Sequence, residues 1–310
     1  MAMNIALVGI GKIAVDQHVP SIQGSSSWRL AATVSRRGTV AGAKRYPDIE
    51  TMLAARLDIP VVSLCLPPAP RFAAASAALE AGRHVMLEKP PGATLAECGS
   101  LGSLARKHEL TVFATWHSRE AAAVGAARDW IEGKCVRRVH VVWREDVRKW
   151  HPGQDWIFEP GGMGVLDPGI NALSILTEIL PQPVHLRGAR LRFPENRQTP
   201  IAADLEFSGN VTAEFDWRER GREVWTINVE TDAGSLLLTE GGGRMFVDGV
   251  ETQLSSGPSA GAPSGEYSRL YARMAELVAV RAVEMDLRPM IHVADAFLIG
   301  RRLTVGPFDW

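Results

Sequence analysis

The chain has 310 residues, a length that predicts two domains, each large enough to bury its own core. Apolar residues make up 46% of the chain and charged residues 22%, a composition that excludes a disordered protein. The formal net charge is -1, from 34 basic and 35 acidic side chains, so the chain has no basic field to bind nucleic acid.

No apolar run is long enough to cross a bilayer, so we expect no membrane partner. The N-terminal residues lack the basic segment of a signal peptide and lead directly into an apolar strand. The cysteines at positions 65, 98 and 135 show no CxxC spacing. We therefore expect free thiols and a cytoplasmic location.

Residues 1–115 alternate short apolar segments with helix-like segments. The expected strands are 5–8, 30–34, 61–66, 84–87 and 110–114. One expected helix ends near Ile22, and two others span 69–81 and 94–108. Such alternation is typical of a doubly wound parallel sheet with helices on both faces.

Residues 9–14, Gly-Ile-Gly-Lys-Ile-Ala, match the G-x-G-x-x-A fingerprint between the first strand and the first helix. Gly9 permits a tight turn, Gly11 lets the backbone approach a pyrophosphate, and Ala14 keeps the helix close to the strand. The helix N-terminus offers N–H groups and a dipole to the phosphates. We expect residues 1–118 to form a Rossmann domain that binds a dinucleotide. The cofactor contacts expected in this turn are Gly9, Gly11, Lys12 and Ile13.

The residue that contacts the cofactor ribose lies about 20 positions after the fingerprint, in the stretch Ser35-Arg36-Arg37. An NAD-specific site has Asp or Glu there. A hydroxyl and a guanidinium instead suit a 2′-phosphate, because arginine pairs with phosphate bidentately. We expect Ser35 and Arg36 to bind NADP, with NAD as a second accepted cofactor. In the alternative interpretation, the arginines are only solvated surface charges.

Glu88-Lys89-Pro90 follows the fourth main strand. At this motif the chain resembles the Gfo/Idh/MocA family, which includes glucose–fructose oxidoreductase and inositol dehydrogenase. The resemblance implies a cis peptide before Pro90. It also implies that the turn after the strand at residues 63–68 lies near the nicotinamide ribose. Pro68 and Arg71 depart from the Asn and His of the family at this turn, so the ribose contacts stay open. The contacts implied by the resemblance are Cys65, Leu66, Pro67, Glu88 and Lys89.

The resemblance extends over most of the chain and is closest to the L-arabinose and D-galactose 1-dehydrogenase branch of the family. The stretches that carry it are 9–14 with 16–18, 84–92, 114–118, 150–154 and 167–172. It implies oxidation of the anomeric carbon of a pyranose sugar to an aldonolactone, with hydride transfer to NAD(P)⁺. It also implies a homodimer or homotetramer that associates through the open face of a second sheet.

After Trp116 the pattern changes to successive strands with few helices, which predicts a mostly antiparallel sheet. Residues 241–243 predict a turn, and the Ser/Gly/Pro/Ala-rich segment 255–265 predicts a mobile loop. We expect residues 119–310 to form an α+β domain for substrate binding and oligomerisation, with a large open sheet. The expected strands are 136–146, 184–193, 201–207, 211–217, 223–229 and 235–239, and the expected helices are 121–132, 267–281 and 291–303.

Asp167 and Pro168 predict a helix start in which Asp167 is the N-cap. Asn171 lies four residues later, so it projects from the same helix face as Asp167. By resemblance, Asn171 occupies the position of a family His, and the aldose branch also has Asn there. Because Asn cannot titrate, the general base must be another group. We expect Asp167 to be the base and Lys89 to hold the C1 oxygen and stabilise its charge. The reverse assignment of these two roles stays open.

The substrate contacts implied by the resemblance are His117, Glu145, Trp150, Asp167, Asn171 and Trp225. Packing is the alternative role of the tryptophans, and His151 is expected to be a loop residue with satisfied polar atoms. The 8 histidines form no HxH or HExxH pattern, so we expect no metal. Two other functions stay open: an inositol or polyol dehydrogenase of the same family, and a non-catalytic NADP-binding sensor.

Overall fold

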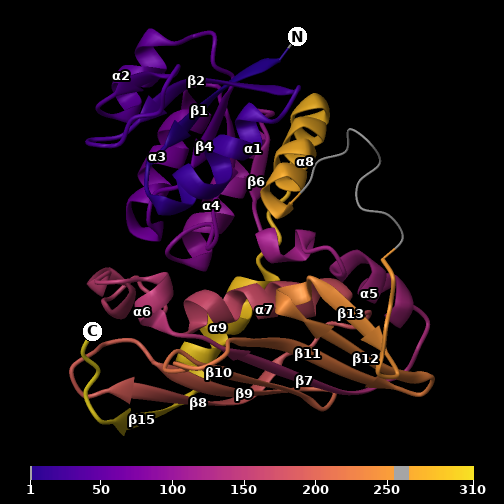
Figure 1. Ribbon diagram of the computed structural model, residues 1–310. Coiled ribbons are helices and arrows are strands. Elements are labelled where there is room, and N and C mark those ends of the chain that lie inside the picture. Colours follow the sequence, from indigo (N-terminus) through magenta and orange to yellow (C-terminus); the bar gives the residue numbers. More distant parts are fainter. Residues whose placement is uncertain (1, 255–264) are drawn as a thin grey trace. The chain divides into compact units, whose positions relative to one another are not determined.

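The computed structural model describes residues 2–254 and 265–310, which form two compact units (Figure 1). The first unit is built from residues 2–117 and 265–287, and the second from 118–254 and 288–310. The sequence prediction instead assigned everything after residue 118 to the second domain. The loop predicted over 255–265 lies, except for Gly265, outside the described residues.

The first unit contains a six-stranded sheet in the order β3-β2-β1-β4-β5-β6, in which all neighbouring strands are parallel. Its strands are β1 (Met3–Val8), β2 (Trp28–Val34), β3 (Lys44–Tyr46), β4 (Val61–Leu64), β5 (His84–Leu87) and β6 (Val112–Ala114). The strand order reverses between β1 and β4. Ligands of such sheets bind beyond the carboxyl ends of the strands at this switch point. The doubly wound sheet predicted from the alternation is confirmed.

The helices of this unit begin with a π-helical turn, η1 (Ala14–His18), which continues directly into α1 (Val19–Gln23). The others are α2 (Ile49–Ala55), α3 (Pro68–Glu80), α4 (Leu95–Lys107) and α8 (Glu266–Val280). Helix α4 begins at a capping box, in which Thr94 and Glu97 satisfy each other's backbone N–H groups.

Helix α8 returns to the first unit because its apolar face fits the first sheet. Tyr267, Leu270, Tyr271 and Met274 are buried at three- and four-residue spacing. They pack against apolar side chains of the sheet, which include Ile5, Val61, Met86 and Phe113. Each such side chain contributes about 1.5–3 kcal/mol when it is fully buried.

The second unit contains a nine-stranded sheet in the order β14-β13-β12-β11-β7-β10-β9-β8-β15. Neighbouring strands are antiparallel except for the pairs β7–β10 and β8–β15. Its strands are β7 (Val136–Arg144), β8 (Leu186–Pro194), β9 (Ala202–Phe207), β10 (Val211–Asp216), β11 (Val224–Thr231), β12 (Gly234–Thr239), β13 (Arg244–Val247), β14 (Val250–Glu251) and β15 (Arg301–Val305). The mostly antiparallel sheet predicted from the sequence is confirmed.

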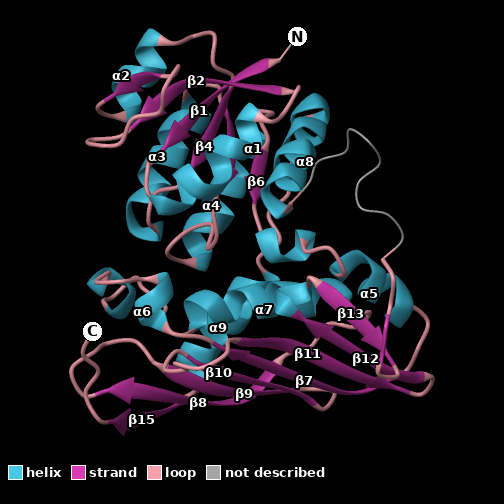
Figure 2. Ribbon diagram, in the orientation of Figure 1, coloured by secondary structure: helices cyan, strands magenta, loops and turns pink. Residues whose placement is uncertain are grey.

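Helices cover one face of this second sheet (Figure 2). The described residues place no helix on the opposite face of the sheet, which we call the open face. The helices on the covered face include α5 (Val124–Ile131), α7 (Leu166–Ile179) and α9 (Arg288–Ile299). The short helical turns are η2 (His117–Glu120), α6 (Val147–Trp150), η3 (Asp155–Phe158) and η4 (Glu240–Gly242). No helix in residues 2–254 and 265–310 combines the length and apolarity needed to cross a lipid bilayer.

Two predictions in this unit were wrong. Helix α7 begins at Leu166 with Val165 as N-cap, so Asp167 lies inside the first turn rather than capping it. The backbone is already helical at Val165, because Gly164 ends the preceding loop at φ +54°. The helix predicted over 291–303 ends at Ile299, and strand β15 follows. At Gly300 a Cβ would lie 2.3 Å from the carbonyl oxygen of Ala296, so the chain passes too close to the helix for a side chain.

Candidate active site

The fingerprint turn lies at the carboxyl end of β1, beside the end of β4. Gly9 has φ +88°, and a Cβ there would lie 3.0 Å from the carbonyl carbon of Cys65 and from the nitrogen of Leu66, so only glycine fits. A Cβ at Gly11 would meet no atom within 4 Å, so the space over this peptide is open. Ala14 is fully buried, which brings the helix onto the strand. These features fit the pyrophosphate of a dinucleotide.

Three of the other predicted cofactor contacts, Lys12, Ile13 and Arg36, lie on the surface. The side chain of Lys12 is 71% exposed, and Ile13 is 39% exposed. Ser35 follows β2, and its Oγ accepts the backbone N–H of Gly38 at 2.9 Å. The Ser35 hydroxyl therefore keeps its proton to donate. Arg36 is exposed next to it, where its guanidinium is accessible to a phosphate.

Glu88 follows β5 and is buried, yet three donors surround its carboxylate. Tyr267 of α8 donates its hydroxyl to Oε1 at 2.7 Å, and Nε2 of His18 lies 3.1 Å from the same oxygen. The backbone N–H of Lys89 donates to Oε2 at 2.7 Å. Burial alone would raise the pKa of Glu88, but the hydrogen bond and charge of His18 lower it to about 2. Glu88 is therefore an anion that orients the first peptide of the Glu-Lys-Pro turn.

His18 is the cationic partner of Glu88. Its Nδ1 lies 2.8 Å from the hydroxyl of Tyr271, which itself donates to Oγ of Ser63 at 3.2 Å. Both ring nitrogens therefore act as donors, one to Tyr271 and one to Glu88. Burial would lower the pKa of His18, but Cys65, Tyr271 and Glu88 together hold it well above its ordinary value. The fold thus keeps a buried ion pair behind the turn that carries Lys89.

The same turn is fixed from α3 by Arg71, which is 2% exposed. Its guanidinium donates to the carbonyl oxygens of Glu88 and Pro90, and its Nε donates to that of Leu66 at 3.1 Å. The peptide between Lys89 and Pro90 is cis, as the resemblance implied. Arg71 therefore joins the ends of β4 and β5, where the cofactor contacts Cys65, Leu66 and Pro67 were predicted.

His117 joins this cluster through α8. Its Nδ1 lies 2.7 Å from the carboxylate of Glu266, and its ring stacks on Tyr267 with a centroid distance of 5.5 Å. Because Tyr267 also donates to Glu88, one helix turn connects His117 with the Glu-Lys-Pro motif. Two predicted functional regions of the first unit are thus held together by α8.

In the second unit, Asp167 lies in the first turn of α7 and is buried. The helix can lie close to the sheet because residue 169 is glycine: a Cβ there would be 2.8 Å from the ring of Phe215. Nε2 of His151 lies 3.3 Å from Oδ2 of Asp167. Asn171 follows one turn later and is half-buried. The structure confirms that these two predicted catalytic residues share one helix.

Glu145 is buried at the end of β7 and is held by two indoles. Trp217 donates its Nε1–H to Oε1 at 3.1 Å, and Trp225 donates to Oε2 at 3.0 Å. A Glu at this position without donors would be costly to bury. The two indoles therefore fix the carboxylate in one orientation.

Three of the predicted residues of the second unit form a continuous cluster with two residues that were not predicted to bind sugar. The ring of His151 lies 5.4 Å from that of Trp217, and the ring of Trp150 lies 5.8 Å from that of Trp225. Trp150 is 39% exposed and donates its Nε1–H to Glu223 at 2.8 Å, so one end of the cluster is anchored and still accessible. We call the following residues the aromatic cluster: Glu145, Trp150, His151, Trp217 and Trp225.

Comparison with known proteins identifies the family. A profile described as an oxidoreductase family with an NAD-binding Rossmann fold, Gfo/Idh/MocA, matches residues 3–115. Over 310 residues the chain is 38% identical to a galactose 1-dehydrogenase from Pseudomonas fluorescens, with 99% of this chain and 98% of that one covered. This chain belongs to the Gfo/Idh/MocA oxidoreductase family.

Solved structures agree with membership of the Gfo/Idh/MocA family. The crystal structure of a D-galactose-1-dehydrogenase protein from Rhizobium etli matches with a TM-score of 0.93 and 51% identity, covering 99% of this chain and 98% of that one. A 3-ketoreductase from Actinomadura kijaniata, in complex with TDP-benzene and NADP, matches with a TM-score of 0.83 at 17% identity. That match covers 98% of this chain and 100% of the other, and it shows the fold alone.

Most of the residues that the sequence did not indicate lie around the Glu88-Lys89-Pro90 motif rather than in it. His18 and Tyr271 hold Glu88 from behind, and Glu266 pairs with His117. His151 was expected to be a loop residue, and it lies beside Asp167. His18 stands four residues after Ala14 of the fingerprint, but that spacing does not reveal a partner 70 residues away.

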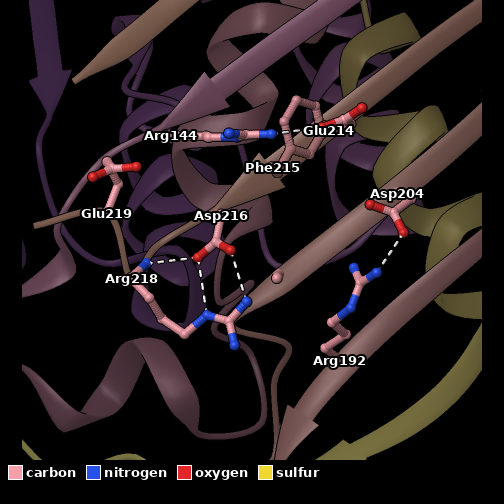
Figure 3. Close-up of a pocket in the computed structure, with 9 residues that line it drawn as sticks. Arg144, Arg192, Asp204, Glu214, Phe215, Asp216, Arg218 and Glu219 are labelled. Carbon is pink, nitrogen blue, oxygen red and sulfur yellow. Dashed lines mark hydrogen bonds and ion pairs between the residues drawn. The ribbon is translucent and has the colours of Figure 1, made fainter. Parts of the chain in front are cut away.

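A cavity of about 600 Å³ also opens on the second sheet of this family member (Figure 3). Its lining residues are Arg144, Arg192, Ala202, Asp204, Glu214, Phe215, Asp216, Arg218 and Glu219. The ring of Phe215 contacts α7, so its neighbours Glu214 and Asp216 project from the open face of the sheet.

Six of the charged groups that line this cavity pair with one another. Arg192 and Asp204 lie 2.7 Å apart, as do Arg218 and Asp216. None of the predicted catalytic or sugar-binding residues lines it. The cavity is therefore not the candidate active site.

Proposed function

We propose that this protein is an aldose 1-dehydrogenase, which oxidises the anomeric carbon of a pyranose sugar to an aldonolactone and passes a hydride to NAD(P)⁺. The observation that carries the proposal is the 51% identity to a D-galactose-1-dehydrogenase protein over 99% of this chain. The aromatic cluster, which includes the buried carboxylate of Glu145, supports the proposal, because sugars bind to aromatic faces and to oriented polar groups. The same similarity favours an aldose over an inositol or another polyol.

In this proposal the residues of the two units have distinct roles. Asp167 accepts the proton of the anomeric hydroxyl, and Asn171 orients that hydroxyl without titrating. Lys89 stabilises the negative charge that develops on the C1 oxygen. NAD(P)⁺, when bound, supplies the hydride acceptor. No step requires a metal, because a cation and hydrogen bonds stabilise the developing charge.

The sugar contacts proposed in the second unit follow from the aromatic cluster. Trp150 is partly exposed and offers a flat apolar face to a pyranose ring. Glu145 is held in one orientation by two indole N–H groups, so it can accept a hydroxyl at a fixed angle. Trp225 and His117 are the remaining proposed contacts. Substrate binding is thus the proposed role of the second unit.

D-Galactose and L-arabinose are the substrates to compare first, because L-arabinopyranose presents the same ring hydroxyls as D-galactopyranose and lacks only the exocyclic carbon. The test is NADPH or NADH formation, followed by absorbance, over D-galactose, L-arabinose, D-fucose, D-xylose and D-glucose. We expect turnover with the first three sugars and weaker turnover with the C4 epimers. Turnover of myo-inositol but of no aldose would contradict the proposal, as would binding of cofactor without any turnover.

We propose that NADP is the preferred cofactor, because Ser35 and Arg36 can bind a 2′-phosphate. Replacing Arg36 with alanine is expected to weaken NADPH binding by about 10-fold or more and NADH binding little, since a charged hydrogen bond contributes about 1.5–3 kcal/mol. Nicotinamide fluorescence measures both dissociation constants without turnover. The exposed neighbour Arg37 is the matched control, and its alanine variant should retain NADPH binding. Equal loss of both cofactors in the Arg36 variant would refute the 2′-phosphate role.

We also propose a homodimer or homotetramer that associates through the open face of the second sheet. Paired charges such as Arg144 with Glu214 cover this face, and they can exchange partners with a second copy. Light scattering coupled to size-exclusion chromatography measures the mass. A monomer at all concentrations would contradict this association.

A further inference from the structure

The side chain of His151 is the structural feature that the proposed roles leave unexplained. It follows the short helix α6, and its Nε2 lies 3.3 Å from Oδ2 of Asp167. The side chain of Asp167 is 10% exposed and that of His151 is 21% exposed. His151 is therefore the more exposed member of this pair.

The other neighbours of His151 indicate which tautomer its neutral ring adopts. The indole Nε1–H of Trp156, which can only donate, lies 3.2 Å from Oε1 of Gln154. This contact identifies Oε1 as the amide oxygen, an acceptor. Nδ1 of His151 lies 3.4 Å from the same oxygen, so it must be the protonated nitrogen. In the neutral imidazole, Nε2 is then an acceptor, so it can accept a hydrogen bond from Asp167 once that carboxyl group has taken up a proton.

From this geometry we propose that His151 is the proton relay of Asp167. The inference rests on the proposed dehydrogenase function. In the reaction, the O–H bond at C1 breaks and its proton moves to the Asp167 carboxylate. The C1–H bond breaks with its electron pair as a hydride to NAD(P)⁺, and a C1–O double bond forms. The proton then passes from Asp167 to Nε2 of His151, and the imidazolium releases a proton to water. Asp167 is thereby returned to its basic form for the next turnover.

Besides Asp167, the described side-chain contacts of His151 are with Gln154, Trp156 and Trp217. On the α7 side the facing titratable group is Asp167. On the β10 side the ring of Trp217 lies against His151, and the indole of Trp217 donates to Glu145. On the η3 side the ring of Trp156 packs edge-on at 6.4 Å. Among the described contacts, His151 is thus a titratable group that touches Asp167 and is more exposed than Asp167 itself.

The test is the turnover of His151→Ala and His151→Asn with D-galactose and NADP. We expect kcat to fall by about 10²-fold in both variants, the low end of a general acid–base contribution, with KM for the sugar nearly unchanged. Added imidazole should restore kcat in His151→Ala, where it can fill the vacated space, and the restoration should grow with the fraction of neutral imidazole. His151→Asn keeps the space filled and should not respond.

His140 provides the matched control, because it also pairs with a carboxylate of the second unit. Its Nε2 lies 3.6 Å from Glu214, next to the cavity on the open face of the sheet. His140→Ala should keep the kcat of the wild type, with or without imidazole.

The outcomes separate this inference from the proposed function. A wild-type protein that reduces NADP with no aldose removes the proposed function and the relay with it. An active wild type together with His151→Asn at wild-type kcat overturns the relay alone. A loss of kcat in His151→Ala that imidazole does not restore makes His151 a packing residue and also overturns the relay.

Discussion

Replacing Asp167 with asparagine is expected to lower kcat by about 10²–10⁴-fold, the typical contribution of a general base. Asparagine has nearly the same shape as aspartate but cannot accept the proton of the anomeric hydroxyl. NADPH binding should be nearly unchanged, because the proposed cofactor contacts lie in the first unit. Steady-state kcat with D-galactose and NADPH fluorescence titration measure the two quantities.

Asp204→Asn is the control for this variant. Asp204 is a partly buried carboxylate of the same unit, but it pairs with Arg192 on the open face of the sheet. Its variant should retain kcat. If Asp167→Asn also retains kcat, the base role passes to Lys89.

The second large effect is expected on stability. Replacing His18 with leucine leaves the Glu88 carboxylate buried without its cation and should lower the free energy of unfolding by about 3–5 kcal/mol. Urea unfolding of the wild type and the variant measures this difference. The exposed His108 of the same unit is the control, and its leucine variant should unfold like the wild type.

The effect of His18→Leu should depend on pH with a definite sign. The pKa of Glu88 is lowered from 4.5 to about 2, so its stabilisation is complete above pH 4.5 and is lost as the pH falls from there toward 2. The pKa of His18 is raised above 6.5, so its stabilisation is complete below pH 6.5 and is lost as the pH rises through the raised value. The difference between wild type and variant should therefore be largest between about pH 4.5 and 6.5.

A double variant checks the cause. If the loss in His18→Leu comes from an unpaired buried carboxylate, His18→Leu combined with Glu88→Leu should recover part of the stability. A pH-independent difference, or a double variant that is as unstable as the sum of the single ones, would show that packing and not the ion pair is lost.

Local patterns predicted the first unit well because each of its signals acts over a few residues. The apolar runs at 5–8 and 84–87 match β1 and β5 within two residues, and the fingerprint turn has the backbone that Gly9 requires. The spacing of Asp167 and Asn171 likewise placed both on α7. The N-cap prediction for Asp167 was wrong because the helix starts before the Asp-Pro pair.

What the sequence could not reveal is which distant elements meet. The apolar spacing of α8 identifies an amphipathic helix but not the sheet that it covers, so its return to the first unit was missed. The partners of Glu88 and Asp167 are lone histidines without a motif. A local signal does identify one further turn: the Asp-Gly pair at 248–249, with φ of +49° and +79°, joins β13 and β14 as a two-residue hairpin.

The proposed reaction removes a hydride from the anomeric carbon. The most direct measurement uses D-galactose deuterated at C1, with NADP, and determines by mass spectrometry where the deuterium goes. Each turnover should place one deuterium on the reduced nicotinamide and leave a galactonolactone without the label. Reduced nicotinamide without deuterium, together with a labelled oxidised sugar, would contradict it, because oxidation would then have occurred at another carbon.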